Sequence, residues 1–168
     1  MREQLDLNYE DEKLRTILKT TRTIAMVGAS AKETKPSFFA LKYLLKKGYF
    51  VIPVNPAYAG QKILNQLTYK QLSDIPGNID MVDVFRSSDF VKPIIKEIIA
   101  IRSKKKINVI WLQLGVWDLS AAELAENSGL TVIMDRCPKI EYGRLVGELG
   151  WIGVNTGCIS SKRRKISL

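Results

Sequence analysis

Histidine is absent from all 168 residues of the chain, and cysteine occurs only as Cys137 and Cys158. The absence of histidine excludes the Ser-His-Asp and Cys-His arrangements that activate a nucleophile. Two cysteines without histidine are too few for a disulfide framework or for the common zinc-binding spacings. The sequence therefore predicts no catalytic residue of these classes and no metal ligand.

Long apolar runs are also lacking. No stretch approaches the ~20 residues that a membrane span needs, and the first residues, Met1 to Gln4, are too polar for a secretory signal. We therefore expect a cytoplasmic protein without a membrane partner. A length of 168 residues with 46% hydrophobic content is enough for one well-buried domain and too little for two.

Acidic residues are the minority charge, with 17 Asp and Glu against 26 Lys and Arg and a formal net charge of +9. This excess favours anionic partners without naming them. Part of it is clustered in Lys104–Lys106 and Lys162–Lys165, where a solvated surface is the plain interpretation. An RNA- or DNA-associated protein using the basic tail is an alternative. It is disfavoured because the chain has no recognition-helix signature, no zinc-finger spacing and no basic strand interleaved with aromatics.

The complete dinucleotide fingerprint G-x-G-x-x-G is missing as well, although its setting is present. An apolar run, Thr23–Val27, leads into Gly28, and an amphipathic helical pattern opens at Pro36. Such a strand-turn-helix unit presents backbone N–H groups to an anion, for example a nucleotide diphosphate. Of the fingerprint's glycines only Gly28 is there; Ser30 takes the second position, and Lys32 adds charge to the turn.

The second strand also ends without the carboxylate that would hold a ribose hydroxyl. Its tip reads Val54, Asn55, Pro56. A simple NAD site is therefore disfavoured, whereas a nucleotide with a 2′- or 3′-phosphate, which a carboxylate would repel, is allowed.

Strand patterns alternate with helical ones along the chain. We expect strands at Thr23–Val27, Tyr49–Val54, Asp80–Val84, Asn108–Leu112 and Leu130–Met134, and helices at Leu5–Thr20, Pro36–Lys47, from Val91, and from a capping box of Ser120 and Glu123 to Gly129. This alternation predicts an α/β protein: one Rossmann-like doubly wound domain with a five-stranded, mainly parallel sheet and helices on both faces. We divide the chain into an N-terminal helical extension (1–20), the Rossmann-type domain (21–141) and a C-terminal extension with a basic tail (142–168). In that extension Trp151, Ile152 and Val154 could cover a sheet edge or a partner subunit, and the sequence leaves both open.

Ligands of such sheets bind at the carboxyl ends of the strands. The candidate binding residues there are Gly28, Ala29, Ser30, Lys32, Val54, Asn55, Pro56, Phe85, Arg86, Ser87, Gln113, Leu114, Gly115 and Cys137, with Asp135, Arg136 and Lys139 nearby. Each has a plainer alternative: Arg86 could pair with Asp89, Asn55 could initiate a turn, Gln113 and Gly115 could shape a loop, and Cys137 could be an inert apolar residue. Asp135 and Glu141 fit a cap or ion-pair role better than a catalytic pair.

The motifs together resemble a known family. They are Val27–Ser30, Val51–Pro56, Asp80–Arg86, Trp111–Val116 and Met134–Glu141. In this order they resemble the small stand-alone CoA-binding proteins, which are similar to the CoA-binding domain of the succinyl-CoA synthetase alpha subunit. The resemblance implies that Gly28–Lys32 faces the phosphates of CoA, Val54–Pro56 the nucleotide, Phe85–Ser87 the adenine side and Gln113–Gly115 the pantetheine side.

The chain lacks the second domain and the phosphorylated histidine of the synthetase, so acyl-CoA ligation is not expected of it alone. The leading hypothesis is a CoA- or acyl-CoA-binding protein, non-catalytic by itself and open to a homo-oligomer or a partner subunit. The alternative is an NADP-linked oxidoreductase with Tyr58, Tyr142 or Lys139 as proton donor. A further hypothesis concerns Cys137: if Arg136 and Lys139 lower its pKa, it could form a mixed disulfide with the CoA thiol.

Overall fold

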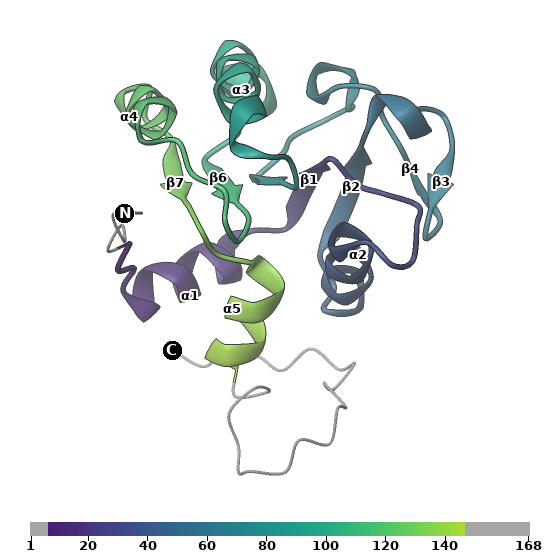
Figure 1. The fold of residues 1–168 in the computed structure, drawn as a ribbon, viewed down its shortest axis with the longest axis horizontal. Coiled ribbons are helices and arrows are strands. Elements are labelled where there is room, and N and C mark those ends of the chain that lie inside the picture. The colour runs from purple at the N-terminus through teal and green to yellow at the C-terminus, as the bar shows by residue number, and fades with distance from the viewer. Residues whose placement is uncertain (1–6, 147–168) are drawn as a thin grey trace.

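The computed structural model describes residues 7–146, which form a parallel five-stranded sheet with helices on both faces (Figure 1). The strand order is β2-β1-β5-β6-β7. The strands are β1 Thr23–Val27, β2 Phe50–Val54, β5 Met81–Val84, β6 Val109–Leu112 and β7 Thr131–Ile133; the helices are α1 Asp11–Thr20, α2 Pro36–Lys46, α3 Val91–Lys105, α4 Leu119–Asn127 and α5 Pro138–Leu145. Short strands β3 (Lys62–Ile63) and β4 (Gln66–Leu67) and three 3₁₀ turns complete these elements. The predicted Rossmann-like α/β fold is confirmed.

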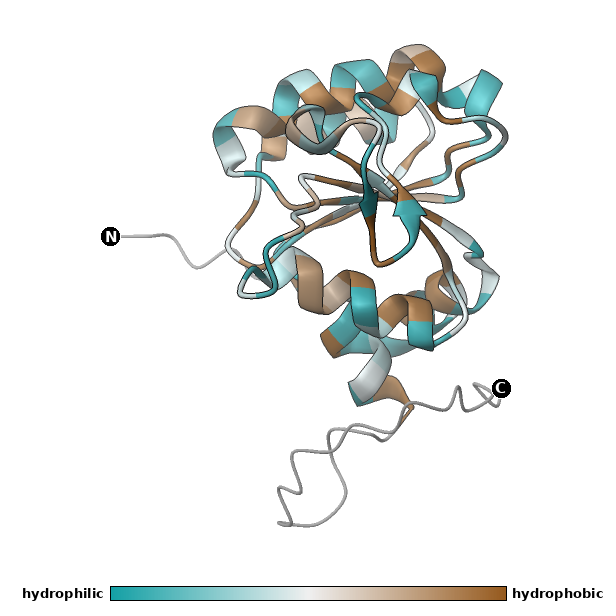
Figure 2. Ribbon diagram, turned by 90° about the vertical axis from the view of Figure 1, so that its right-hand side faces the viewer, coloured by the Kyte–Doolittle hydropathy of each residue, from teal (hydrophilic) through white to brown (hydrophobic). Residues whose placement is uncertain are grey.

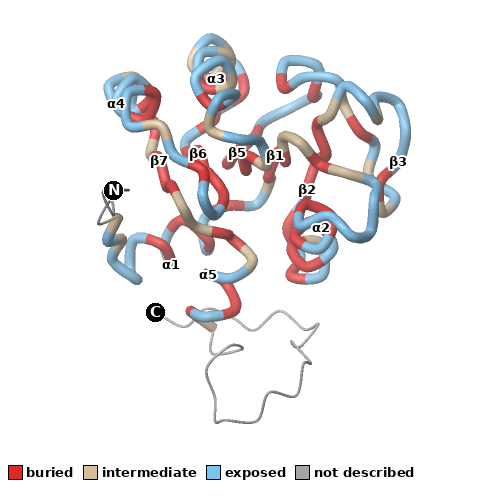
Figure 3. The backbone as a smooth tube through the Cα atoms, viewed as in Figure 1, coloured by how far each residue is buried: buried red, intermediate tan, exposed pale blue. Residues whose placement is uncertain are grey.

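The sheet separates two apolar cores, one under α3 and α4 and the other under α1, α2 and α5 (Figures 1 and 2). Alternate residues of a strand enter opposite cores: Val82 and Ile110 pack toward α3 and α4, and Met26 and Trp111 pack toward the other three helices. Because both faces are covered, the central strands are buried along their length (Figure 3). This explains why these strands are apolar without alternation.

The direction in which the chain builds the sheet reverses between β1 and β5, because β2 lies on one side of β1 and the later strands on the other. The Rossmann strand that would lie beyond β2 is reduced to a parallel bridge between Val54 and Tyr69. Tyr69 donates its backbone N–H to Pro53 O at 3.0 Å and accepts from Asn55 N at 2.9 Å. A crevice at the carboxyl ends of β1 and β5 is the expected binding place in such a sheet.

Helix α4 begins one residue before the predicted capping box. Its N-cap is Asp118, whose side chain accepts a hydrogen bond from Ala121 N at 3.0 Å, and Ser120 Oγ donates to the same carboxylate at 2.8 Å. The prediction of Ser120 and Glu123 as the capping pair is therefore wrong. Asp118 stands two positions before Ser120 and, being charged, is the stronger acceptor.

Helix α5 was not expected, because its eight residues are too few to show a clear period. The prediction places the end of the Rossmann-type domain between residues 141 and 142, a position that falls inside this helix. Helix α5 is tied to α1: Arg15 donates to Leu145 O at 2.8 Å, and Arg144 pairs with Asp11 at 2.7 Å. The C-terminal apolar residues and the basic tail of the sequence predictions lie outside the described residues, as do residues 1–6. Among residues 7–146, no helix is long and apolar enough to cross a bilayer.

Candidate functional site

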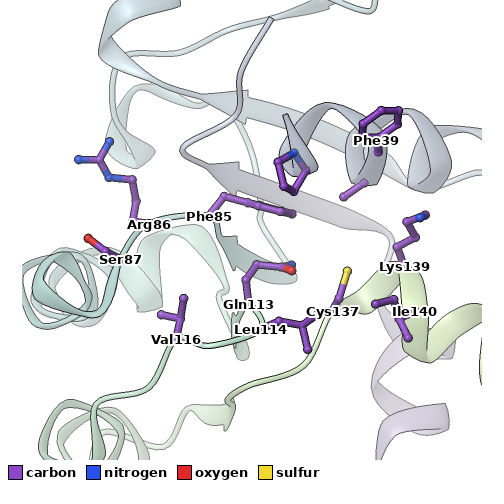
Figure 4. A pocket seen from close by; sticks show the side chains of 12 residues that line it. Phe39, Phe85, Arg86, Ser87, Gln113, Leu114, Val116, Cys137, Lys139 and Ile140 are labelled. Atoms are coloured by element: carbon purple, nitrogen blue, oxygen red, sulfur yellow. The ribbon is translucent and has the colours of Figure 1, made fainter. Parts of the chain in front are cut away.

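A cavity of about 560 Å³ opens at the carboxyl ends of β5 and β6, between the first turns of α2 and α5 (Figure 4). Carbon-rich side chains make up most of its wall, with the basic groups of Arg86 and Lys139 at opposite ends (Figure 4). The lining residues are Pro36, Phe39, Ala40, Phe85, Arg86, Ser87, Gln113, Leu114, Val116, Cys137, Lys139 and Ile140.

The cavity brings together six of the candidate binding residues: Phe85, Arg86, Ser87, Gln113, Leu114 and Cys137. The candidates that do not line it are Gly28, Ala29, Ser30, Lys32, Val54, Asn55, Pro56 and Gly115. Two of these, Ala29 and Val54, are buried in the cores with 0% and 3% of their surface exposed. Lys139, named beside the candidates, also lines the cavity. A list of strand ends missed Val116 and the helix residues Pro36, Phe39, Ala40 and Ile140, because helix residues that fold over the strand ends do not follow a strand in the sequence.

Gly28 connects the first turn to the cavity wall. Its φ is +83°, and a β-carbon at this position would lie 2.3 Å from the carbonyl oxygen of Phe85 and 3.0 Å from Cδ of Arg86. Its N–H donates to Val54 O at 2.9 Å. Only glycine allows this contact, since an L side chain would meet backbone and would also disfavour the left-handed conformation. The turn after β1 therefore packs directly on the segment after β5.

The hydrogen bonds inside this turn occupy several of its N–H groups. Ser30 N donates to Ser37 Oγ, and Lys32 N donates to Ser30 Oγ, both at 3.1 Å. The side chains of Lys32 and Lys35 are exposed beside the start of α2. An anion at this turn would therefore meet lysine ammonium groups together with the positive end of the α2 dipole.

Asn55 ties the ends of two neighbouring strands together. Its Nδ2 donates to Ala29 O at 2.7 Å, and its Oδ1 accepts from Ala57 N at 3.0 Å. The second bond caps the 3₁₀ turn η1 (Pro56–Tyr58). The turn-initiating alternative for Asn55 is thus confirmed, and the same side chain also fixes the backbone beside Gly28.

Asp135 and Glu141, the two acidic residues that the sequence analysis considered as a catalytic pair, have structural partners. Asp135 accepts a hydrogen bond from Gly115 N at 2.7 Å, which fixes the loop after β6. Glu141 pairs with Arg144 at 2.6 Å on the side of α5 that faces α1. The interpretation of both residues as cap or ion-pair groups is confirmed.

Arg86 contributes charge at one end of the cavity, with its guanidinium carbon 4.3 Å from the centroid of the Phe90 ring. At the other end Lys139 lies over Tyr43, with Nζ at 5.9 Å from the ring centroid. Both cations rest on aromatic faces, which leaves their outer sides open to an anionic ligand. The cavity thus combines an apolar middle with basic ends.

Asp83, inside β5, is a polar residue of this region that the sequence analysis did not single out. It is fully buried, and its Oδ1 accepts a hydrogen bond from Gln113 Nε2 at 2.7 Å. Its Oδ2 has no partner within residues 7–146. Burial raises the pKa of this carboxyl to about 7, against the lowering effect of Gln113. A carboxylate within the apolar strand Met81–Val84 was the available sequence signal, because buried acids cluster at functional sites.

Cys137 is 7% exposed, and its sulfur points into the cavity (Figure 4). Burial raises the pKa of the thiol, and the neighbouring Asp83 raises it further. The mixed-disulfide hypothesis required Arg136 and Lys139 to lower this pKa, and that condition is not met. Lys139 has a lowering effect that desolvation outweighs, and the Arg136 guanidinium is turned away, donating to Leu7 O at 2.8 Å.

The raised pKa predicts that the Cys137 thiol reacts slowly with alkylating reagents. We expect the peptide that contains Cys137 to be alkylated by iodoacetamide at pH 7.5 at least tenfold more slowly in the folded protein than after denaturation in urea, since only the thiolate reacts. Mass spectrometry of a time course measures both rates. Equal rates in the two states would contradict a buried thiol with a raised pKa.

The chain is similar in sequence and in structure to known proteins. A sequence profile described as "CoA binding domain" matches residues 22–143. The uncharacterized protein YneT of Bacillus subtilis (strain 168) is 31% identical over 135 residues, covering 80% of this chain and 96% of YneT. A hypothetical protein from Pyrococcus horikoshii OT3 is 35% identical, with a TM-score of 0.76 over 83% of this chain and 94% of that one.

A larger enzyme shares the fold. The dinucleotide-forming acetyl-coenzyme A synthetase 1 of Ca. Korarchaeum cryptofilum matches with a TM-score of 0.57 and 22% identity, over 71% of this chain and 26% of the enzyme chain. At that identity the match speaks for the fold alone. The profile spans most of the sequence, and the YneT match extends over 80% of it, so the chain belongs to the CoA binding domain family.

Proposed function

We propose that this protein binds coenzyme A or an acyl-CoA across the carboxyl ends of its central strands. The observation that carries the proposal is the cavity of about 560 Å³ at the ends of β5 and β6, beside the point where the strand order reverses. Family membership supports CoA as the ligand. In this proposal the phosphates lie at the Gly28–Lys32 turn and the pantetheine arm enters the cavity.

The chemistry of the cavity agrees with the two halves of CoA. Its nucleotide carries a diphosphate and a 3′-phosphate, which suit the exposed Lys32 and the end of the cavity at Arg86. Its arm is thin and largely apolar, which suits the wall around Phe85 and Val116. Exposed Leu114 and Ile140 line the same cavity, where a thioester-bound acyl group would find apolar surface.

We infer binding without catalysis by the chain alone. Asp135 and Glu141, the two carboxylates that follow β7, are held by Gly115 and Arg144. Asp83 has no exposed surface and lies behind Gln113. The Cys137 thiol has a raised pKa, which makes it a poor nucleophile at neutral pH. These features support a carrier or binding module over a transferase.

A thermal-shift comparison tests the proposal with CoA, acetyl-CoA, NADP, NAD and ATP at equal concentrations. We expect CoA species to raise the melting temperature selectively, because a ligand at 100 times its Kd stabilises the native state by about 2.7 kcal/mol. A shift produced only by NADP would contradict CoA binding and favour the reductase alternative. No shift with any nucleotide, from a sample with a cooperative transition, would overturn the proposal for the isolated chain.

A further inference from the structure

Gln113 is the polar side chain that reaches from the cavity to a buried carboxylate. It lines the cavity in its middle (Figure 4), and its Nε2 donates to Asp83 Oδ1 at 2.7 Å. Asp83 lies behind it, in β5 between Met26 of β1 and Trp111 of β6, with no exposed surface. One end of the Gln113 amide is therefore fixed from inside the protein.

The other end of this amide is available to a ligand. Within residues 7–146, Oε1 of Gln113 accepts no hydrogen bond. The buried side-chain atoms of that range that lack a partner are Thr68 Oγ1 and Asp83 Oδ2, so Oε1 of Gln113 is not a buried atom. It is therefore accessible from the cavity that Gln113 lines. An ionised carboxylate only accepts hydrogen bonds, so the nitrogen of the amide must face Asp83 and the oxygen must face away.

We propose that Asp83 is a positioning residue that sets ligand specificity: it holds Gln113 so that Oε1 is presented to the cavity as an acceptor for an amide N–H of the ligand. This inference rests on the proposed function, in which the pantetheine arm of CoA enters the cavity. The arm carries amide N–H groups from which Oε1 of Gln113 can accept a hydrogen bond. A buried acceptor aimed at a ligand N–H discriminates strongly, since a ligand that lacks the donor leaves the acceptor unpaired.

Protonation of Asp83 would reverse this arrangement. A neutral carboxyl can donate to Gln113 Oε1, and the amide nitrogen then turns toward the cavity as a donor. The titratable side chains that line the cavity are Arg86 from the loop after β5, Cys137 from the N-cap of α5 and Lys139 from its first turn. The lining residues of α2 and of the loop after β6 do not titrate. Arg86 is always charged. Cys137 loses its proton only at high pH, because its pKa is raised, which leaves Asp83 to govern binding near neutrality.

The test is titration calorimetry with two ligands, CoA and 3′-phosphoadenosine 5′-diphosphate, which lacks the arm. The ratio of their dissociation constants at one pH measures the preference for the arm. The armless ligand ends in a free phosphate with a second ionisation near neutral pH, which the diester of CoA lacks, so pH profiles are compared between the wild-type protein and the variants, in which this ligand effect is the same. We expect the wild-type protein to favour CoA at pH 8, and we expect Asp83→Leu to reduce that preference roughly five- to tenfold. Asp83→Asn can pair with Gln113 in either orientation, so its preference should be intermediate.

The pH profile separates positioning from a merely structural role. From pH 8 to pH 6 the preference of the wild-type protein should fall relative to that of Asp83→Asn measured at the same pH. Asp80→Asn is the matched control: Asp80 precedes the same strand at the opposite end of the sheet, where it accepts from Arg22 N and Thr23 N at 2.9 Å. It should leave the preference and its pH profile as in the wild type.

The outcomes are distinct. If the wild-type protein binds neither ligand, the proposed function itself fails. If it binds both equally, or if Asp83→Leu and Asp83→Asn keep the full preference with the wild-type pH profile, nucleotide binding stands and the positioning role of Asp83 is overturned. Circular dichroism of each variant establishes that it is folded, and Asp83→Asn retains a polar partner for Gln113 where Asp83→Leu does not.

Discussion

Replacing Gly28 by alanine should abolish CoA binding and lower the free energy of unfolding by roughly 3–5 kcal/mol. The added β-carbon would lie 2.3 Å from the Phe85 carbonyl oxygen, a backbone atom that cannot rotate away. The left-handed conformation, with φ at +83°, adds about 1–2 kcal/mol for any L side chain. The turn after β1 and the cavity wall after β5 would have to separate. The proposed phosphate subsite at the Gly28–Lys32 turn would then lie too far from the cavity that is proposed to hold the pantetheine arm.

Gly77→Ala is the control for this substitution. Gly77 also has a positive φ, +80°, but nothing lies within 4 Å of a β-carbon built there. The Gly77→Ala variant should lose only about 1–2 kcal/mol of unfolding free energy, with CoA binding intact. Urea denaturation and calorimetry of both variants measure the two effects; equal losses at the two glycines would contradict the close approach at Gly28.

Replacing Asp83 by asparagine should stabilise the protein at pH 8, by about 4 kcal/mol or roughly 10 °C in Tm. Burial raises the pKa of this carboxyl from 3.8 to about 7. A raised pKa means that the folded state holds the proton more tightly than the unfolded chain, so the stabilising contribution is complete below pH ~4 and is lost as the pH rises through about 7. Asparagine keeps a partner for Gln113 without the ionisation.

The measurement is urea denaturation of both proteins between pH 4 and pH 8. The difference should be small at pH 4 and should grow steadily toward pH 8. Asp118 provides the opposite sign: the hydrogen bond from Ala121 N lowers its pKa, so its contribution is present at neutral pH and is lost as the pH falls below ~4. A wild-type protein whose stability relative to Asp83→Asn does not change with pH would contradict the raised pKa of Asp83.

A carboxylate that destabilises the fold at neutral pH, next to the middle of the cavity, is typical of a functional site. The stability prediction and the specificity proposal both involve the ionisation of Asp83. They are measured separately, because the first depends only on burial of the carboxyl and the second also depends on the orientation of the Gln113 amide.

The amino-acid sequence by itself determined the sheet and the edge of it where the cavity lies. Continuous apolar runs bounded by turn residues predict strands buried on both faces, and the start of α2 at Pro36 and the end at Gly48 were readable because proline and glycine act locally. The order of polar residues after each strand also brought Phe85, Arg86, Gln113 and Cys137 to one place, since the carboxyl ends of parallel strands share one edge.

What only the tertiary structure decided depends on contacts between distant segments. The fold of α5 over the sheet placed Cys137 in an apolar wall, where desolvation reversed the expected direction of its pKa shift. The close approach of Gly28 to Phe85 and the pairing of Asp83 with Gln113 join residues 57 and 30 positions apart. A local pattern specifies which residues form a strand or a turn, but burial and partners at a site depend on how those elements pack, because solvation and hydrogen bonding are properties of the assembled core.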